Sequence, residues 1–171
     1  MNRKIARFEK ISFEQFKKDM IDTYKNMYSE KEIKEIYNGI ELPVRATKYS
    51  AGHDIKIPFA MSVFPNDTLK IPTGIRCEMD GEYVMLVFPR SSLGIKKNMY
   101  ITNTVPVIDA DYYNAKNEGH IFICIKNGGE NILSLSKNEA ITQAVFVPFG
   151  VADEEEVVRE RVGGIGSTGV N

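Results

Sequence analysis

Y-V-M-L-V-F at residues 83–88 and H-I-F-I-C-I-K at residues 120–126 are the two stretches that decide the fold. Both runs are rich in β-branched and aromatic residues, which favour strands. Each run is also too short for a core helix, which needs about ten residues or more. The two runs therefore predict β-strands.

The chain after Pro43 continues in the same way. Short apolar runs alternate with Gly, Pro, Asn and Asp, which is typical of an all-β domain, and K-N-G-G at residues 126–129 predicts a turn. Many short strands in about a hundred residues are typical of a sandwich, a jelly roll or a barrel, and the pattern alone leaves these three open. The expected strands are residues 54–60, 68–78, 83–88, 100–104, 119–126, 132–135 and 140–148.

Before Pro43 the apolar residues have helical spacing instead. Ser12 and Ser29 are predicted N-caps of two helices, and Asn38-Gly39 is expected to end the second. We expect both apolar stripes to pack against the domain. The first stripe is Phe13, Phe16, Met20, Tyr24 and Met27, and the second is Ile33, Ile36 and Tyr37.

These patterns divide the chain into three parts. Residues 1–41 are predicted as an N-terminal helical extension, residues 42–152 as the β domain, and residues 153–171 as an acidic linker and a C-terminal arm. The arm ends in R-V-G-G-I-G-S-T-G-V-N, whose glycines lose too much entropy on ordering to build a core. Such a flexible segment suits closure over an anionic ligand, with donors from Arg161, Ser167 and Thr168. A frayed terminus is the alternative.

Composition excludes several functional classes. With 171 residues, 43% hydrophobic and 26% charged, the chain fits an ordinary soluble domain. A net charge of −1 gives no global field toward nucleic acid or an anionic membrane, so neither is expected as a partner. The chain shows no signal-peptide core and no run of eighteen apolar residues. Cys77 and Cys124 lack metal-ligand spacing and are expected to be reduced thiols in a cytoplasmic protein.

Two segments contain residues suited to phosphate chemistry. In P-R-S-S-L-G, residues 89–94, amides, hydroxyls and a guanidinium follow an apolar strand and could form an anion-binding nest or only a polar turn. In V-I-D-A-D-Y-Y, residues 107–113, an extended backbone would place Asp109 and Asp111 on one face. A carboxylate there is a candidate general base and a tyrosine ring a candidate sugar platform. A solvated hairpin is the alternative.

Three further polar groups have structural explanations as well. Asp54 starts a strand after the small residues of Y-S-A-G-H, where it could be a simple cap. Gln143 stands in an apolar strand and needs partners, from a ligand or from a neighbouring turn. His53 and His120 lack ligand spacing, so structural roles are expected for both.

Five segments in order carry a family resemblance. A-T-K-Y-S-A-G-H-D-I, P-R-S-S-L-G, V-I-D-A-D-Y, A-I-T-Q and R-V-G-G-I-G-S-T-G resemble the five motifs of the trimeric dUTP diphosphatases, or dUTPases. The resemblance runs from Arg45 to Asn171 and leaves the helical region before Leu42 outside. It implies a mainly β, distorted jelly roll that forms a homotrimer, with active sites at subunit interfaces built from more than one chain.

The resemblance also implies an activity and a role for each matching residue. The family hydrolyses dUTP to dUMP and pyrophosphate, which limits uracil in DNA and supplies dUMP for dTMP synthesis. Asp109 matches the acid that orients the attacking water toward the α-phosphorus. Tyr112 matches the ring that stacks under the deoxyribose, and Asn103 falls where uracil is contacted. The phosphate contacts match Arg90, Ser91, Ser92, Gly94 and Gln143, joined by Arg161, Ser167 and Thr168 of the closing arm.

The implied cofactor is Mg²⁺ held by the three phosphates and by water. Asp54 matches the acid that reaches the metal through water, and no direct protein ligand is expected. Such a metal needs no dedicated protein cage.

The sequence departs from the family pattern at several positions. Ile165 replaces the usual tail phenylalanine, Pro106 a glycine and Ala140 an arginine. Residues 113–120 form a longer connection than usual after the tyrosine.

Two alternatives remain beside hydrolysis. A dCTP deaminase of the related fold needs a carboxylate in the strand after the third motif, and H-I-F-I-C-I-K-N has none. A regulatory protein of the same fold could use nucleotide binding as a switch, with a protein partner on the N-terminal helices.

Overall fold

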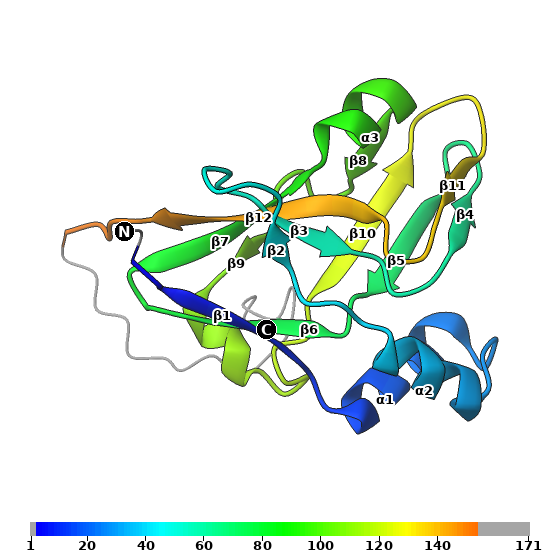
Figure 1. The fold of residues 1–171 in the computed structure, drawn as a ribbon, viewed down its shortest axis with the longest axis horizontal. Helices are drawn as coiled ribbons and strands as arrows, with labels where there is room; N and C mark the ends of the chain where they lie inside the picture. The colour runs from blue at the N-terminus through cyan, green and yellow to red at the C-terminus, as the bar shows by residue number, and fades with distance from the viewer. Residues whose placement is uncertain (1–2, 154–171) are drawn as a thin grey trace.

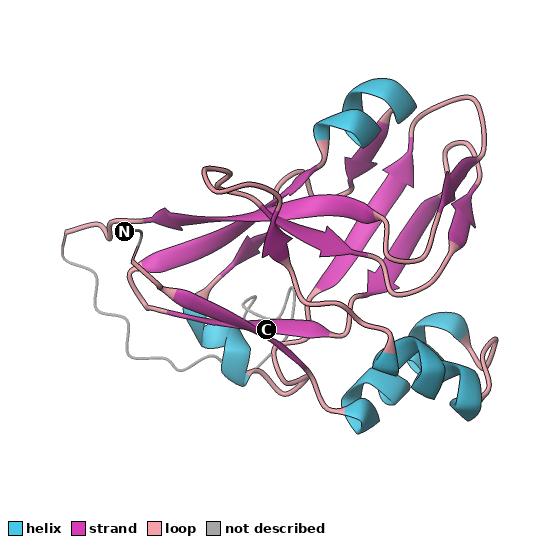
Figure 2. Ribbon diagram, viewed as in Figure 1, coloured by secondary structure: helices cyan, strands magenta, loops and turns pink. Residues whose placement is uncertain are grey.

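A computed structural model describes residues 3–153 of the chain, and the fold is a distorted β jelly roll with helices at its ends (Figures 1 and 2). Its largest sheet is antiparallel and has the order β2-β3-β12-β7-β9. Its strands are β2 (Val44–Arg45), β3 (His53–Lys56), β12 (Ala140–Pro148), β7 (Tyr83–Pro89) and β9 (Val107–Ile108). The first motif leads from β2 into β3, the second begins at the end of β7, the third begins with β9 and the fourth begins β12.

Three smaller antiparallel sheets complete the β structure. The first is β5 (Thr68–Pro72), β10 (Phe122–Asn127) and β8 (Met99–Ile101). The second pairs β11 (Leu133–Leu135) with β4 (Met61–Val63), and the third pairs β1 (Ala6–Lys10) with β6 (Ile75–Met79). The expected mainly β jelly roll is confirmed.

The strand expected at residues 68–78 is in fact two strands, β5 and β6, separated at Gly74. Gly74 has φ +73°, which a residue with a side chain rarely adopts. A Cβ there would also meet Ile40 Cδ1 at 2.2 Å. The chain changes its pairing partner at this point, from β10 before Gly74 to β1 after it. The strand expected at residues 140–148 is confirmed with both of its ends, as β12. The other expected strands are present with different ends, and β3 stops before Pro58.

The two expected N-terminal helices are present as α1 (Phe13–Tyr24) and α2 (Glu30–Asn38). The Ser12 side chain accepts a hydrogen bond from the Gln15 amide, and Ser29 forms a reciprocal capping box with Glu32. The first helix ends earlier than its apolar stripe predicted, because Lys25 adopts a left-handed conformation. Met27 is consequently 72% exposed. Two shorter helices follow later, α3 (Ser91–Lys97) and the 3₁₀ helix η1 (Ala110–Asn114).

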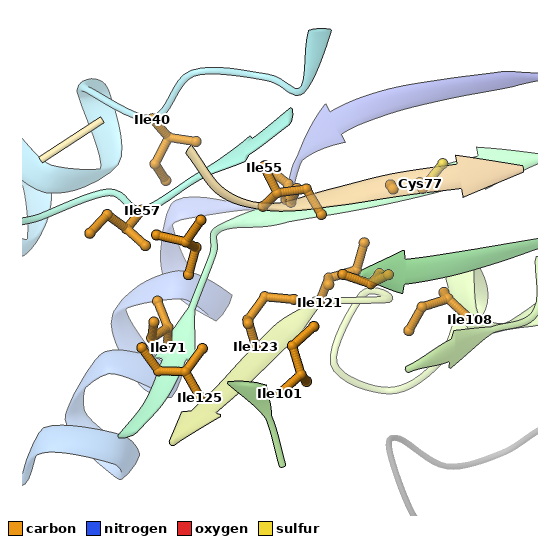
Figure 3. Packing of buried hydrophobic residues seen from close by; sticks show 14 of the residues in the cluster. Ile40, Ile55, Ile57, Ile71, Cys77, Ile101, Ile108, Ile121, Ile123 and Ile125 are labelled. Atoms are coloured by element: carbon orange, nitrogen blue, oxygen red, sulfur yellow. The ribbon is translucent and has the colours of Figure 1, made fainter. Parts of the chain in front are cut away.

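One hydrophobic core joins the helices to the sheets. Phe16 and Met20 of α1 and Ile33 of α2 belong to the same buried cluster as the strand residues. Figure 3 shows the isoleucines of this cluster facing one another between the strands. Residues 6–10, which the sequence did not predict as a strand, pair along their whole length with β6. The N-terminal residues thus pack as part of the β domain, while the predicted boundaries at 41/42 and 152/153 stay predictions.

The cysteines and the helix lengths add two facts. Cys77 is buried and Cys124 partly buried, and neither forms a disulfide. Burial raises the pKa of the Cys77 thiol to about 12, so it is a poor nucleophile. No helix within residues 3–153 is long and apolar enough to cross a membrane.

Candidate functional site

Three predicted site residues meet at one end of the large sheet. Asp54 on β3 is paired in register with Gln143 on β12, and Gln143 is paired with Phe88 on β7. Arg90 follows β7 directly, and its guanidinium lies 3.6 Å from the Asp54 carboxylate. The Arg90 side chain is 40% exposed, so it remains accessible to a further anion. The first, second and fourth motifs therefore converge in one chain.

Gly52 belongs to this group, although the sequence analysis did not single it out. A Cβ at Gly52 would meet the Gln143 Oε1 at 2.4 Å and the Gln143 Cβ at 3.2 Å. The backbone of the first motif therefore passes directly against the Gln143 side chain. The glycine within S-A-G-H-D was the available signal for this close approach.

The second motif forms the start of α3 rather than an open nest or a simple turn. Arg90 is the N-cap, and the amides of Leu93 and Gly94 both donate to the Arg90 carbonyl. Ser91 and Ser92 are exposed in the first turn. The amides of Ser91 and Ser92 come too early in the helix to have an intrahelical acceptor, so they and the serine hydroxyls can bind an anion.

Asp109 lies at a different end of the sheet. It is exposed and precedes η1 as the N-cap residue. The expected extended conformation holds for Asp109 but is wrong for Asp111, which is inside the 3₁₀ helix. The two carboxylates therefore do not share the face of a strand. The signal for the helix was weak, because D-A-D-Y-Y contains residues that favour turns as much as strands.

The strand register separates Asp109 from the Arg90 group. Ile108 is paired with Met85, which places Asp109 beside Val84, whereas Arg90 lies beyond the far end of β7. The separation along β7 is six residues, or roughly 20 Å at about 3.3 Å per residue. One chain therefore brings the first, second and fourth motifs together but leaves the third motif apart.

Tyr112 is 2% exposed, and its hydroxyl donates to the His120 carbonyl oxygen over 2.7 Å. A second bond reaches this hydroxyl from the Asn117 amide at 2.8 Å. The Tyr112 ring thus presents little accessible surface, and its predicted role as a platform for deoxyribose stays a prediction.

Asn103 is exposed in the turn between β8 and β9. Pro106, at the position where the family commonly has glycine, is accommodated as an acceptor: its carbonyl takes the Val87 amide at 3.1 Å. A proline lacks the N–H group but keeps this carbonyl, so the strand pairing survives the substitution.

Arg161, Ser167 and Thr168 lie outside the described residues. Their predicted role in a closing arm stays a prediction.

The oxygens of Asp54 and Gln143, near Arg90, fit a metal ion that arrives bound to an anionic ligand. Within residues 3–153 there is no cluster of three or more histidine, cysteine, aspartate or glutamate side chains that could hold a metal. Asp54 and Gln143 offer neighbouring carboxylate and amide oxygens, which are the hard donors that Mg²⁺ and its bound water prefer.

Both histidines have structural surroundings. Burial lowers the pKa of His53, and burial likewise lowers the pKa of His120. His120 is completely buried: its Nε2 accepts the Gly74 amide at 2.8 Å, and its Nδ1 lies 2.5 Å from the Asp19 carboxylate. The acidic partner on α1 was missed, although Asp19 stands next to Met20 on the buried stripe and needed a partner there.

The chain is similar to known proteins over most of its length. A sequence model of the dUTPase family matches residues 38–169. A deoxyuridine 5′-triphosphate nucleotidohydrolase of Lactococcus lactis is 42% identical over 134 residues, covering 77% of this chain and 89% of that protein. One from Paraburkholderia phytofirmans is 36% identical over 137 residues, covering 75% of this chain and 89% of that protein.

Solved structures agree with this similarity. The dUTPase of Streptococcus mutans superposes with a TM-score of 0.64 at 33% identity, covering 85% of this chain and 98% of that one. A dUTPase of phage phi11 of Staphylococcus aureus, which coordinates a structural Mg(II) ion, gives a TM-score of 0.59 at 21% identity, covering 71% and 92%. At 21% identity the likeness to the phage protein shows the fold alone.

Proposed function

The chain belongs to the dUTPase family, and from that premise we propose that it hydrolyses dUTP to dUMP and pyrophosphate. The observation that carries the proposal is the convergence of Asp54, Arg90 and Gln143 at one end of the large sheet, next to the exposed serines of α3. This group offers a guanidinium, hydroxyls and an amide to a triphosphate. Such donors neutralise charge that grows on a leaving pyrophosphate.

Asp109 is the proposed catalytic residue. Its exposed carboxylate would orient a water molecule toward the α-phosphorus and take up its proton. The new bond joins the water oxygen to the α-phosphorus, and the bond from that phosphorus to the pyrophosphate oxygen breaks. Asn103 is the proposed contact of uracil, and Tyr112 stays the proposed contact of the sugar.

Sharing of the site between chains supports a homotrimer. Asp109 lies roughly 20 Å from the Arg90 group along β7, a span too long for both to act on one α-phosphate within a chain. A neighbouring protomer that supplies Asp109 would complete each site, and closed rotational symmetry would repeat the arrangement. Arg161, Ser167 and Thr168 are the proposed donors of a closing arm.

Mg²⁺ is the proposed cofactor, carried by the triphosphate. Asp54 would bind a water molecule of its coordination shell, and Gln143 would contact the phosphates beside it. When bound, the ion draws negative charge from the phosphate oxygens and so makes the phosphorus easier to attack. The Arg90–Asp54 pair keeps the carboxylate in place at 3.6 Å before the nucleotide arrives.

A nucleotide panel tests the proposal. Pyrophosphate release is measured with dUTP, dTTP, dCTP and UTP in the presence of Mg²⁺, and then with EDTA in excess. We expect release from dUTP alone, and its loss with EDTA. Equal release from dTTP or UTP would contradict the proposed base and sugar selectivity, and ammonia release from dCTP would favour the deaminase.

The regulatory alternative is independent of this chemistry. It needs a protein partner on α1 and α2, and it can coexist with hydrolysis. A cytoplasmic location is part of the proposal, since both cysteines are unpaired as in proteins of reducing compartments.

A further inference from the structure

The connection after the third motif, residues 113–120, is held by residues from the beginning of the chain. The Ser12 amide and hydroxyl donate to the two carboxylate oxygens of Glu118, at 2.7 and 2.6 Å. Glu118 has φ +58° and Gly119 has φ +70°. A left-handed glutamate is costly, so the surrounding contacts must hold it in place.

Tyr113, the first residue of this connection, makes two more contacts. The Tyr113 hydroxyl donates to Glu9 of β1 at 2.8 Å, and this bond is the main reason why the pKa of Glu9 is lowered. The Arg76 guanidinium lies 4.3 Å from the centre of the Tyr113 ring. The end of η1 is therefore fixed from two neighbouring strands, β1 and β6.

A further contact, between His120 and α1, is buried. The Nε2 of His120 accepts the Gly74 amide, so the ring is neutral and its Nδ1 carries the proton. That proton is donated to Asp19 of α1, whose carboxylate also accepts from Gln15 at 2.9 Å. Removing Asp19 would leave a donor unpaired in the core, which is more costly than losing an exposed bond.

His120 is in turn hydrogen-bonded to η1. Its carbonyl accepts the Tyr112 hydroxyl at 2.7 Å, and the Asn117 amide bridges both groups. Tyr112 lies within η1, and its amide donates to the Asp109 carbonyl. A continuous path of hydrogen bonds thus runs from α1 to the proposed catalytic acid.

We propose that Asp19 and Ser12 are positioning residues, which hold η1 through His120 and Glu118 so that Asp109 stands correctly for its water molecule. This inference rests on the proposed function. The helices then have a task in the reaction itself, although residues 1–37 precede the part of the chain that matches the family.

Steady-state kinetics with dUTP separates positioning from stability. In Asp19→Ala we expect kcat to fall about tenfold and KM to change less than about twofold, because misplacement of a catalytic group by about 1 Å costs up to a hundredfold. Asp19→Asn keeps a carbonyl acceptor for the His120 proton, so it should restore most of kcat. All assays are run at least 15 °C below the lowest melting temperature of the set.

A matched pair of helix caps provides the control. Ser12→Ala and Ser29→Ala each remove the cap hydroxyl of one helix, but only Ser12 bonds to the connection that follows η1. We expect kcat to fall at least threefold in Ser12→Ala and to stay unchanged in Ser29→Ala. Should Asp19→Ala fail to fold, this pair decides the question alone.

Hydrogen exchange gives a readout that needs no activity. The amides of Tyr112 and Ala115 are bonded within η1 and should exchange at least tenfold faster in Asp19→Ala than in Ser29→Ala. If Asp19→Ala and Ser12→Ala both kept the kcat and the amide exchange rates of the unaltered protein, the inference would be overturned and the proposed function would remain. Absence of pyrophosphate release by the unaltered protein would overturn the proposed function, and the inference with it.

Discussion

At the scale of single residues, the proposed catalytic acid Asp109 carries the most direct prediction. Asp109→Asn keeps the size of the side chain but removes the charge that is proposed to orient and deprotonate water. We expect pyrophosphate release to fall at least a thousandfold, within the roughly ten-thousandfold effect of general acid–base catalysis combined with positioning. Binding of a non-hydrolysable dUTP analogue, measured by calorimetry, should stay within about threefold. Asp67, which is exposed in the turn between β4 and β5, provides the control Asp67→Asn. Loss of pyrophosphate release in this control would contradict the assignment of Asp109.

His120 makes stability depend on pH. Burial lowers its pKa below the usual 6.5, so the unfolded chain takes up a proton on acidification before the folded chain does. The contribution of neutral His120 to the free energy of unfolding is therefore complete above pH 6.5 and decreases as the pH falls below it. The loss from this residue between pH 7.5 and 5.5 is at most about 1.4 kcal/mol, because one pKa unit corresponds to about that much.

Urea unfolding of the parent and of His120→Gln measures this effect. Glutamine does not titrate, so the variant should lose less stability over the same pH interval, although it starts from a lower value. The other histidine, His53, also has a lowered pKa and contributes equally in both proteins. An identical pH dependence of the two proteins would contradict the prediction.

The family resemblance pointed to three residues whose proximity the fold shows, while their roles stay predictions. Asp54, Arg90 and Gln143 were predicted from their motifs, and the structure places them together. The pairing of Asp19 with His120 was not predicted, because the two residues are 101 positions apart and only the folded chain joins them. An acid on an apolar helix face indicates that a buried partner exists, but its identity depends on tertiary structure.

At the scale of elements, the proposed closing arm is the clearest target. Deletion of residues 161–171 removes Arg161 and the two hydroxyls and keeps every core residue identified within residues 3–153. We expect the melting temperature to stay within about 2 °C and kcat/KM for dUTP to fall at least a hundredfold, because an arginine contact to phosphate is strong. Arg161→Lys, which keeps one charge, should recover part of the activity. Parental turnover by the shortened chain would refute the arm's role.

Elements were predictable where local chemistry sets them. The capping serines Ser12 and Ser29 located both N-terminal helices, since a cap is read within four residues. The break between β5 and β6 was missed because I-P-T-G-I is apolar on both sides of Gly74. Strand β1 was missed for a different reason: its pairing with β6 joins residues about seventy positions apart.

At the scale of the whole molecule, the proposed sharing of sites between the chains of a trimer predicts complementation. Asp109→Asn and Arg90→Ala should each be inactive alone. In mixed trimers, a site is complete when one chain supplies a natural Asp109 and its neighbour a natural Arg90. Random mixing of equal amounts makes about a quarter of the sites complete in a cyclic trimer. Co-purification with two different tags after co-expression keeps only trimers that contain both kinds of chain, and each of these has one complete site of three. The selected protein should therefore recover roughly a third of parental activity.

The double variant provides the control for mixing. In trimers that combine the double variant with Asp109→Asn, no chain supplies a natural Asp109, so these trimers should stay inactive. Failure of the two single variants to complement would place both residues in the same chain's site. This separation was implied by the family resemblance rather than by residue spacing, because strand register is fixed only on folding.

The ladder between β1 and β6 has a practical consequence for anyone shortening this protein. Removing the first ten residues would uncover the hydrogen-bonding groups of β6 along its full length, from Ile75 to Met79. An uncovered edge of that kind invites pairing with other chains and hence aggregation. Purification tags are better joined ahead of residue 3 than used to replace the amino-terminal segment.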